Sequence, residues 1–300
     1  MRSTGTLLCI GSAAAFGAMA VFGKLAYDNG ATVGTLLAVR FVLAAAMFWA
    51  LVLADRGAVA ELRGLVRRDV AIALGLGAVG YAAQAGCFFA ALDRIDASLL
   101  SLMLYTFPAM VAVAAIVLGR EHADPTRFAA LALASVGLVL VLASARPGAL
   151  DPLGAGLALG AAMIYTTYIL VSQGIAGRIG PTLLSALVCT GAAVTLTAGS
   201  ALLGDLHLGQ VDAAGWGWLA GIALVSTVAA VSLFFAGLKR VGPTTASILS
   251  TVEPVVTVVL AFLVFGELLG SLQLLGGALV VAAVIVLGSH RPREPMGAAA

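Results

Sequence analysis

The chain has 300 residues, of which 62% are hydrophobic and only 10% are charged, and its mean hydropathy is +1.11. A soluble domain carries about a quarter charged residues, so this composition excludes a soluble globular protein. The net charge of +2 comes from basic residues scattered over short connections, without the basic stripe typical of a nucleic-acid-binding surface. We therefore expect an all-α integral membrane protein that lies in the lipid bilayer and binds no nucleic acid.

Apolar blocks of about 17 to 25 residues recur along the chain, and this length crosses a ~30 Å hydrocarbon core as a helix. In chain order we predict ten transmembrane helices, over Thr6–Lys24, Thr32–Leu53, Val70–Leu92, Ala97–Leu118, Phe128–Ser144, Leu153–Ser172, Pro181–Leu203, Trp216–Leu238, Thr244–Phe265 and Leu272–Gly288. Turn-forming residues and charges separate the blocks. The tail 291–300 is predicted to be disordered and cytoplasmic.

The distribution of Lys and Arg predicts the orientation of the helices. With the N-terminus inside, twelve of the 16 basic residues fall on the cytoplasmic side and three on the outer side, while Arg40 lies within a span. Cytoplasmic loops of membrane proteins carry this excess of Lys and Arg. We expect a multi-pass protein of the cell inner (plasma) membrane with both termini in the cytoplasm.

An internal repeat divides the chain. Shifting the sequence by 146 residues superposes the segment 88–94 on 234–240, in which two phenylalanines and an arginine match. The same shift aligns further residues at fixed spacing: Ser101 with Ser247, Pro108 with Pro254, Ala115 with Ala261 and Glu121 with Glu267. It moves each span by five places, an odd number, so the halves must have opposite orientation. We predict two inverted five-helix repeats, 1–148 and 149–290, an arrangement typical of transporters.

These motifs resemble the EamA family of the drug/metabolite transporter superfamily. The resemblance rests on the stretch from Ala91 through Ala97-Ser98-Leu99-Leu100 to Pro108 and Gly119-Arg120-Glu121, on its second copy from Glu253-Pro254 to Gly266-Glu267, and on Arg40-Phe41. It covers the chain to about Gly288. It implies a ten-helix carrier, and most carriers of this kind export amino acids or other small metabolites using ion or substrate gradients.

Two charged side chains, Arg40 and Glu253, lie well inside predicted spans, where a central charge costs ~2.5 to 3.5 kcal/mol to insert. Such residues are candidates for a substrate or coupling path. Alternatively, the long stem of Arg40 reaches the outer surface, and Glu253 either caps carbonyls freed by Pro254 or stays protonated because burial disfavours its charge. A protonated carboxyl would also suit a proton carrier.

Other path candidates fall in stripes on single helix faces. The matching prolines Pro108 and Pro254 each remove a backbone hydrogen bond and predict kinks beside a cavity. The stripes either line this path or join helices by hydrogen bonds worth ~0.6 kcal/mol each. Their members are Tyr81 and Gln84 with Phe88, Ser101 and Tyr105, Tyr165 and Tyr168 with Ser172, and Ser247 with Thr251. Lys24 and Tyr27 suggest interface anchors, and Glu121 and Glu267 suggest residues that end helices.

The sequence also predicts that Arg40 and Glu253 face one cavity and interact, directly or through water or substrate. At a rise of 1.5 Å per residue, Arg40 lies roughly 12 Å below the outer surface and Glu253 about 13 Å from the inner one. In a ~30 Å core the axial gap is then around 5 Å. A carboxylate of the solute could bind Arg40 while Glu253 gains a proton.

Several motif matches carry no chemistry of their own. The GxGxxG match at 75–80 follows no strand, and the chain has no P-loop and no HExxH. We read that glycine motif and the pairs Gly156/Gly160 and Gly217/Gly221 as close helix packing. We expect no cofactor and no metal.

The predicted function is secondary transport of small polar metabolites such as amino acids, with protons as a candidate coupling ion and room for a homodimer. The alternative is an integral-membrane enzyme acting on lipid-borne substrates through Glu253, and it lacks a second acidic, His or metal group at membrane depth.

Overall fold

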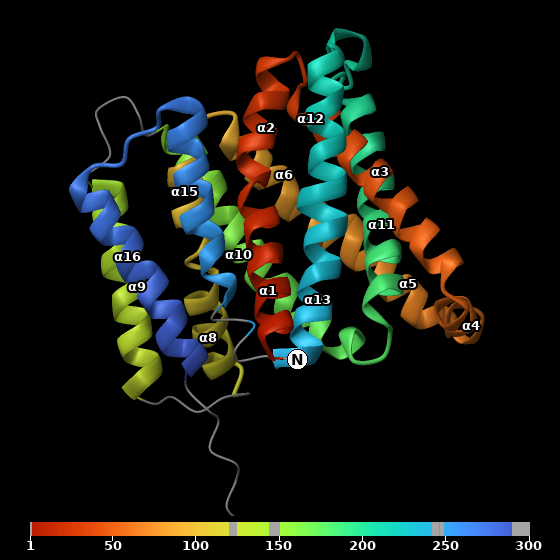
Figure 1. Cartoon of the computed structure of the whole chain (residues 1–300), viewed down its shortest axis with the longest axis horizontal. Coiled ribbons are helices and arrows are strands. Elements are labelled where there is room, and N and C mark those ends of the chain that lie inside the picture. The colour runs from red at the N-terminus through yellow and green to blue at the C-terminus, as the bar shows by residue number, and fades with distance from the viewer. Residues whose placement is uncertain (1, 120–124, 144–150, 242–245, 247–248, 290–300) are drawn as a thin grey trace, which may run out of the picture.

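The computed structural model describes residues 2–119, 125–143, 151–241, 246 and 249–289, and every regular element in these ranges is helical (Figure 1). The first half of the chain forms α1 (Arg2–Gly17), α2 (Met19–Asp28), α3 (Val33–Ala54), α4 (Arg56–Gly64), α5 (Arg67–Gly75), the π-helical segment η1 (Leu76–Tyr81), α6 (Ala82–Leu92), α7 (Ala97–Leu104), α8 (Phe107–Val117) and α9 (Pro125–Ala143).

The second half forms a matching series of helices. They are α10 (Pro152–Ala176), α11 (Pro181–Leu202), the short 3₁₀ turn η2 (Leu208–Gln210), α12 (Ala213–Ala223), the π-helical segment η3 (Leu224–Ala229), α13 (Ala230–Val241), α15 (Val252–Phe265) and α16 (Ser271–Ser289). The repeat boundary at 148/149, the tail 291–300 and Glu121 lie outside the described residues.

Seven helices of the described chain are long and apolar enough to cross a membrane: Ser3–Asp28, Val33–Ala54, Arg67–Leu92, Ala97–Val117, Pro152–Ser172, Pro181–Leu202 and Ala213–Val241. Three further apolar helices are shorter, over Phe128–Val141, Val252–Phe265 and Ser271–Val286. All ten overlap predicted spans, since the same apolar runs that fit the bilayer also form helices, but only the seven are long enough to confirm the prediction of a membrane crossing.

Local sequence sets the helix ends. The side chains of Thr32, Asp55, Asp151 and Asp212 accept hydrogen bonds from backbone N–H groups in the first turn of the helices that follow them, as N-cap residues do. At the end of α15, Gly266 has φ +67°, a left-handed conformation that glycine adopts without a steric penalty. Gly266 therefore ends this helix, and the side chain of Glu267 accepts hydrogen bonds from another helix, α7.

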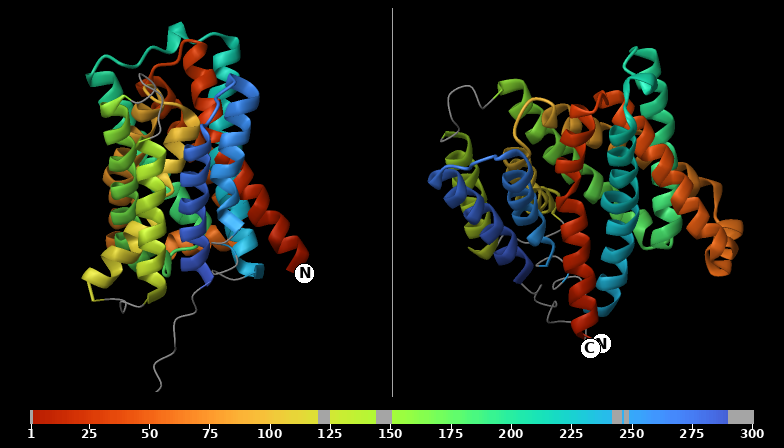
Figure 2. Two further views of the ribbon diagram at one scale, coloured as in Figure 1. Left: turned by 90° about the vertical axis from the view of Figure 1, so that its left-hand side faces the viewer. Right: turned by 45° about the horizontal axis from the view of Figure 1, so that its top comes forward.

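Pairs of helices from the two halves pack against each other in opposite directions. On α3 and α11, the Trp49 Nε1 donates to Thr190 Oγ1 at 2.9 Å, while further along the Ser200 hydroxyl donates to the Gly34 carbonyl at 3.2 Å. The helix pairs α7 and α15, α9 and α16, α1 and α13, and α6 and α10 also join the two halves. Figure 2 shows these helices running side by side, while α4 stands apart at one edge of the bundle.

Small residues permit some of these contacts and not others. A Cβ atom at Gly77 would overlap the Val188 carbonyl, so the glycine motif at 75–80 does serve close helix packing. The same prediction is wrong for Gly156, Gly160 and Gly217, because no atom of the described chain lies within 4 Å of a Cβ built there. These three glycines lie on outward faces of their helices, where spacing alone could not tell an exterior face from an interior one.

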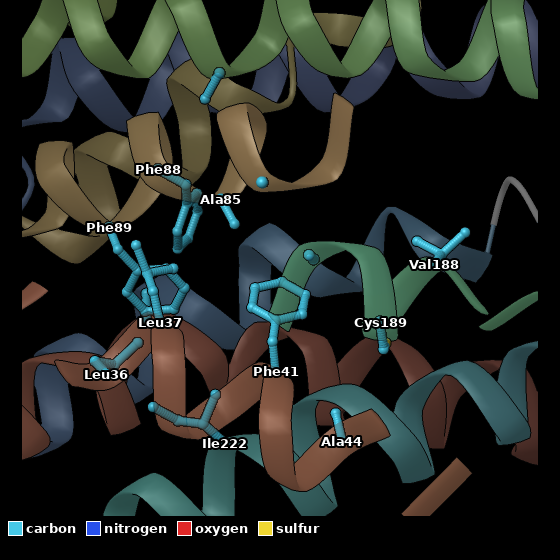
Figure 3. Packing of buried hydrophobic residues seen from close by; sticks show 14 of the residues in the cluster. Leu36, Leu37, Phe41, Ala44, Ala85, Phe88, Phe89, Val188, Cys189 and Ile222 are labelled. Carbon is cyan, nitrogen blue, oxygen red and sulfur yellow. The ribbon is translucent and has the colours of Figure 1, made fainter. Parts of the chain in front are cut away.

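A buried core joins α3 to the helices around it. Figure 3 shows Leu36, Leu37 and Phe41 of α3 beside Phe88 and Phe89 of α6. Leu36, Phe41 and Phe89 have no exposed surface. This core fixes the position of Arg40, the residue directly before Phe41, which lies in the wall of the candidate site.

Candidate functional site

A cavity of about 670 Å³ lies where the two halves meet. It is lined by eleven of the residues predicted from the sequence: Arg40, Tyr81, Gln84, Phe88, Ser101, Tyr105, Pro108, Tyr165, Tyr168, Ser172 and Glu253. Thr251 and Pro254 are buried but do not line it, and Ser247 lies outside the described residues. The cavity extends to Ser172 and Pro181, which flank the α10–α11 connection at the end of the bundle where α1 begins (Figure 1).

Arg40 is held within this cavity wall and does not reach the outer surface. Its side chain is 2% exposed. The Nε atom donates to Thr227 Oγ1 at 3.1 Å and Nη2 donates to the Tyr81 hydroxyl at 3.3 Å. Its Cζ lies 4.8 Å from the Phe41 ring centre and 5.3 Å from that of Phe89, distances at which aromatic faces attract a cation. Within the described residues no carboxylate pairs with Arg40.

Glu253 lies in the wall of the same cavity and contacts Tyr105. The Tyr105 hydroxyl is 2.9 Å from Glu253 Oε2 and 2.6 Å from the Ser250 carbonyl oxygen. Pro254 has no N–H to donate to Ser250, four residues earlier. The freed carbonyl is therefore satisfied by Tyr105 from α7's end and not by Glu253, which corrects the alternative role of Glu253 as a cap.

A series of aromatic rings runs along the wall between the two charged residues. Tyr81 and Tyr168 have ring centres 6.0 Å apart, Tyr168 and Tyr165 6.3 Å, and Tyr165 and Phe107 4.6 Å. Phe107 lies in turn 5.9 Å from Tyr105. Arg40 and Glu253 thus lie at the two ends of one aromatic wall, and no ion pair joins these two described residues directly.

Helix interruptions occur at the predicted proline positions. The span that contains Pro108 breaks at Tyr105–Thr106, between α7 and α8, and Pro108 stands in the first turn of α8. In the other half a turn at Thr251 precedes Pro254, in the first turn of α15. Both breaks border the cavity, because Tyr105 and Glu253 belong to its lining.

A polar cluster lies at the opposite end of the bundle. Lys24 Nζ lies 2.8 Å from Glu267 Oε1 and 3.7 Å from Asp96 Oδ1. Glu267 also accepts hydrogen bonds from the backbone N–H groups of Ala97 and Ser98 and from the Ser98 hydroxyl. Burial raises the pKa of Glu267, but the hydrogen bonds from Lys24 and Ser98 and the charge of Lys24 outweigh burial and hold this pKa below its ordinary value.

These residues make contacts that the sequence did not predict. Lys24 pairs with a glutamate from the other half, and Tyr27 donates a hydrogen bond to the Phe89 carbonyl at 2.9 Å. The Glu267 side chain caps the first turn of α7, while its backbone N–H donates to the Ala261 carbonyl at the end of its own helix. The side-chain partners are more than 60 residues apart, so the sequence near each residue gives no sign of them.

Sequence reasoning also missed residues of the cavity, above all Thr227. The signal was present, since the shift of 146 residues that defines the repeat aligns Tyr81 with Thr227. Ser12 and Thr257 were missed too. The Ser12 hydroxyl donates to the Ala230 carbonyl at 2.7 Å and Thr257 donates to the Gly17 carbonyl at 2.9 Å. Among the described residues no group of three or more His, Cys, Asp and Glu could hold a metal ion.

Comparison with known proteins connects this architecture to a family. The model of the EamA-like transporter family matches residues 3–143 and again residues 152–289. An uncharacterized transporter of Bacillus subtilis (strain 168), YcbK, is 26% identical over 280 residues, covering 91% of this chain and 89% of that protein. An uncharacterized transporter of Archaeoglobus fulgidus is 28% identical over 225 residues, covering 75% of this chain and 78% of the relative.

A solved crystal structure has the same fold. It aligns with a TM-score of 0.66 at 20% sequence identity, covering 95% of this chain and 97% of that one. The double match of the family model covers nearly all of the chain, once in each half. The chain belongs to the EamA-like transporter family and is a membrane transporter.

Proposed function

We propose that the chain is a secondary active transporter that exports small polar metabolites such as amino acids across the inner membrane by alternating access. The observation that carries this proposal is the cavity between the halves, in which a buried arginine and a partly buried glutamate lie at the two ends of one aromatic wall. A zwitterion presents one anionic and one cationic group, so it suits a site with one residue of each kind.

The transport mechanism rests on two inverted five-helix repeats in a ten-helix protein. Three observations support this arrangement: ten apolar helices coincide with predicted spans, corresponding helices of the two halves pack antiparallel, and π-helical segments occur at matching places in both halves. Two similar halves of opposite orientation can exchange conformations around a fixed site, which then opens alternately to each side.

The side to which the cavity leads supports export. Its lining extends to the α10–α11 connection, near the start of α1, and the excess of Lys and Arg assigns this side to the cytoplasm. The other end carries the Lys24–Glu267 cluster. This conformation accepts a solute from the cytoplasm, as an exporter must. Protons are the proposed coupling ion, because Glu253 can carry one within the cavity wall.

The test is counterflow in proteoliposomes. Vesicles containing the purified chain are loaded with one of the twenty unlabelled L-amino acids and diluted into a trace of the same labelled amino acid. A carrier gives transient, saturable accumulation for at least one of them, and Arg40→Gln strongly reduces it. Flux that rises linearly without counterflow would contradict the proposal in favour of a channel, and chemical conversion of the solute would favour an enzyme.

The orientation has its own measurement. Single cysteines introduced between residues 205 and 215 should react with an impermeant maleimide added outside intact cells, and cysteines at 63–68 should react only after the cells are opened. The reverse pattern would overturn the assignment of both termini to the cytoplasm.

A further inference from the structure

Arg40 is held by two residues that occupy the same position in the two repeats. Thr227 Oγ1 accepts from its Nε atom at 3.1 Å, and the Tyr81 hydroxyl accepts from Nη2 at 3.3 Å. Their numbers differ by 146, the shift that superposes the two halves of the sequence. One hydrogen bond to Arg40 therefore comes from each half, from corresponding positions in the two repeats.

Both partners stand on π-helical segments. Tyr81 is the last residue of η1, and Thr227 lies within η3. A π-bulge adds a residue to a helical turn and often occurs at functional sites, since it changes the direction of the side chains that follow. At η3 the Thr227 hydroxyl donates to the Ile222 carbonyl, five residues earlier, at 3.0 Å. The Thr227 hydroxyl thus donates to the Ile222 carbonyl near the π-helical segment and accepts a hydrogen bond from Arg40 Nε.

Only one arginine serves this site. The helix α11, which packs antiparallel on α3, contains no charged residue. A cation that lies between two halves and bonds to corresponding residues of each needs no second copy. Two guanidinium groups at this place would repel each other strongly in a medium that screens charge poorly.

The contacts of Arg40 leave part of its guanidinium available. A guanidinium has five N–H donors in a rigid fork. In the described residues Nε and Nη2 have acceptors, while no acceptor is found for Nη1, and Arg40 belongs to the lining of the cavity. The surrounding rings of Phe41, Phe89 and Tyr81 attract the cation but accept no strong hydrogen bond from it.

We propose that Thr227 is a positioning residue for substrate recognition: together with Tyr81 it fixes the Arg40 guanidinium so that the free Nη1 edge binds a carboxylate of the substrate. This inference rests on the proposed function and names the group of the substrate that the site reads. Thr227 acts through Arg40. Loss of its hydroxyl should therefore weaken the binding of carboxylates and leave the movement of the two halves unchanged.

The variants Thr227→Val and Thr227→Ser test this role. Valine removes the hydroxyl at nearly constant volume, and serine keeps it. Thr190→Val is the matched control, because Thr190 likewise donates to a carbonyl of its own helix, that of Ala186, and accepts from another side chain, Trp49, yet lies outside the cavity lining. Any general cost of losing such a hydroxyl appears in both valine variants.

The first readout is counterflow of the L-amino acid that the wild-type chain transports fastest, compared with the carboxamide of the same amino acid. Thr227→Val should raise the half-saturation concentration of the acid about tenfold, change the maximal rate less than about twofold, and leave the amide unaffected. Thr227→Ser and Thr190→Val should stay within about twofold of wild type. Equal losses for acid and amide, or Thr227→Val matching Thr190→Val, would overturn the inference.

A second readout needs no transported solute. Phenylglyoxal modifies arginine, and mass spectrometry of the peptide containing residue 40 gives its rate of modification in the purified full chain. Thr227→Val should react several-fold faster than wild type and Thr190→Val, because the guanidinium is no longer fixed. Equal rates would reject the positioning role. If wild type transports none of the twenty amino acids, the proposed substrate class fails, and this rate alone decides the inference.

Discussion

The Tyr105 hydroxyl contacts two acceptors at once: the Ser250 carbonyl at 2.6 Å and Glu253 Oε2 at 2.9 Å. A phenol carries a single proton, so it can donate to only one of them. When it donates to Ser250, the contact with Glu253 requires the carboxyl group to donate, which only the protonated acid can do. When the glutamate is ionised, the hydroxyl turns toward it. The pair can therefore hold Glu253 with or without a proton.

This relationship predicts the effect of Glu253→Gln. The amide can donate to Tyr105 as the neutral acid does but cannot release a proton. We expect the variant to keep counterflow of the unlabelled and labelled solute within a few-fold of wild type and to lose accumulation driven by an imposed pH gradient. Both are measured in the same proteoliposomes. Full accumulation by Glu253→Gln under a proton gradient would leave the glutamate as a structural residue beside the helix break.

The Lys24–Glu267 cluster predicts a dependence of stability on pH. Because the pKa of Glu267 is lower in the folded chain than its ordinary value of 4.5, its contribution is fully present above 4.5 and is lost as pH falls through the folded pKa. Glu267→Gln should lower the free energy of unfolding by about 2 kcal/mol at neutral pH. The difference from wild type should vanish at acid pH.

Thermal unfolding of the detergent-solubilised chain between about pH 3 and pH 7 measures this difference. Asp151→Asn is the control, because the hydrogen bond from Arg94 lowers the pKa of Asp151 as well, but at the exposed surface. Such exposed pairs contribute little to stability. A Glu267→Gln curve parallel to that of wild type over the whole range would show that the ionised glutamate does not stabilise this end of the bundle.

The contact between α11 and the α5–η1 span predicts a site intolerant of any side chain. A Cβ atom at Gly191 would overlap the Leu74 carbonyl, whereas a Cβ atom at Gly199 of the same helix would meet no atom within 4 Å. Gly191→Ala should therefore lower the unfolding free energy by about 1 to 3 kcal/mol, and Gly199→Ala should not destabilise. Thermal unfolding of the two variants in one detergent compares them, and equal midpoints would contradict the close approach.

The sequence was sufficient to predict the seven helices that are long and apolar enough to cross a membrane, because each depends on local composition. The predicted span Pro181–Leu203 differs from α11 by one residue, since a proline begins the helix and an apolar run continues it. Arg40 and Glu253 could also be recognised, because charges within apolar runs need no structure to be noticed. Their axial positions were predicted from helix rise, and both residues do line the same cavity.

Lateral contacts between distant residues could not be predicted. Lys24 and Glu267 are 243 residues apart, and nothing in the sequence around either one indicates the other. The π-helical turns at η1 and η3 left no sign in the local sequence, although the Thr227 hydroxyl donates to the Ile222 carbonyl within one of them. The phase of these turns decides which side chains reach Arg40, so the contacts of Tyr81 and Thr227 with the arginine came only from the structure.

Pro254 is predicted to matter for conformational exchange more than for folding. Pro254→Ala supplies an N–H group that can bond to Ser250, in competition with Tyr105, and it would favour a continuous helix through the turn at Thr251. We expect normal amounts of protein in the membrane with counterflow slowed several-fold, because a stiffer helix hinders the change between the two states. Quantitative immunoblots and counterflow rates measure both. Reduced amounts with a normal rate per molecule would show that the proline serves folding alone.

Arg40 and Glu253 are predicted to act as one unit in transport. They make no direct ion pair in the described residues and lie in the wall of one cavity. Under the proposed function, coupling between them passes through a solute that binds both. Neutralising either one, as Arg40→Gln or Glu253→Gln, should reduce proton-driven accumulation about a hundredfold, equivalent to about 2.7 kcal/mol. The double variant should lose little more, because residues that act together are not additive.

The control is a second double variant, Arg40→Gln with Glu267→Gln. Glu267 lies outside the cavity lining, so the fold-reductions in transport caused by these two substitutions should simply multiply. Initial rates of proton-driven accumulation in proteoliposomes, corrected for the amount of reconstituted protein, give both cycles. If the cavity pair proved as additive as the control pair, the solute would not connect the two residues, and the carboxylate bound at Arg40 would have no link to the proton at Glu253.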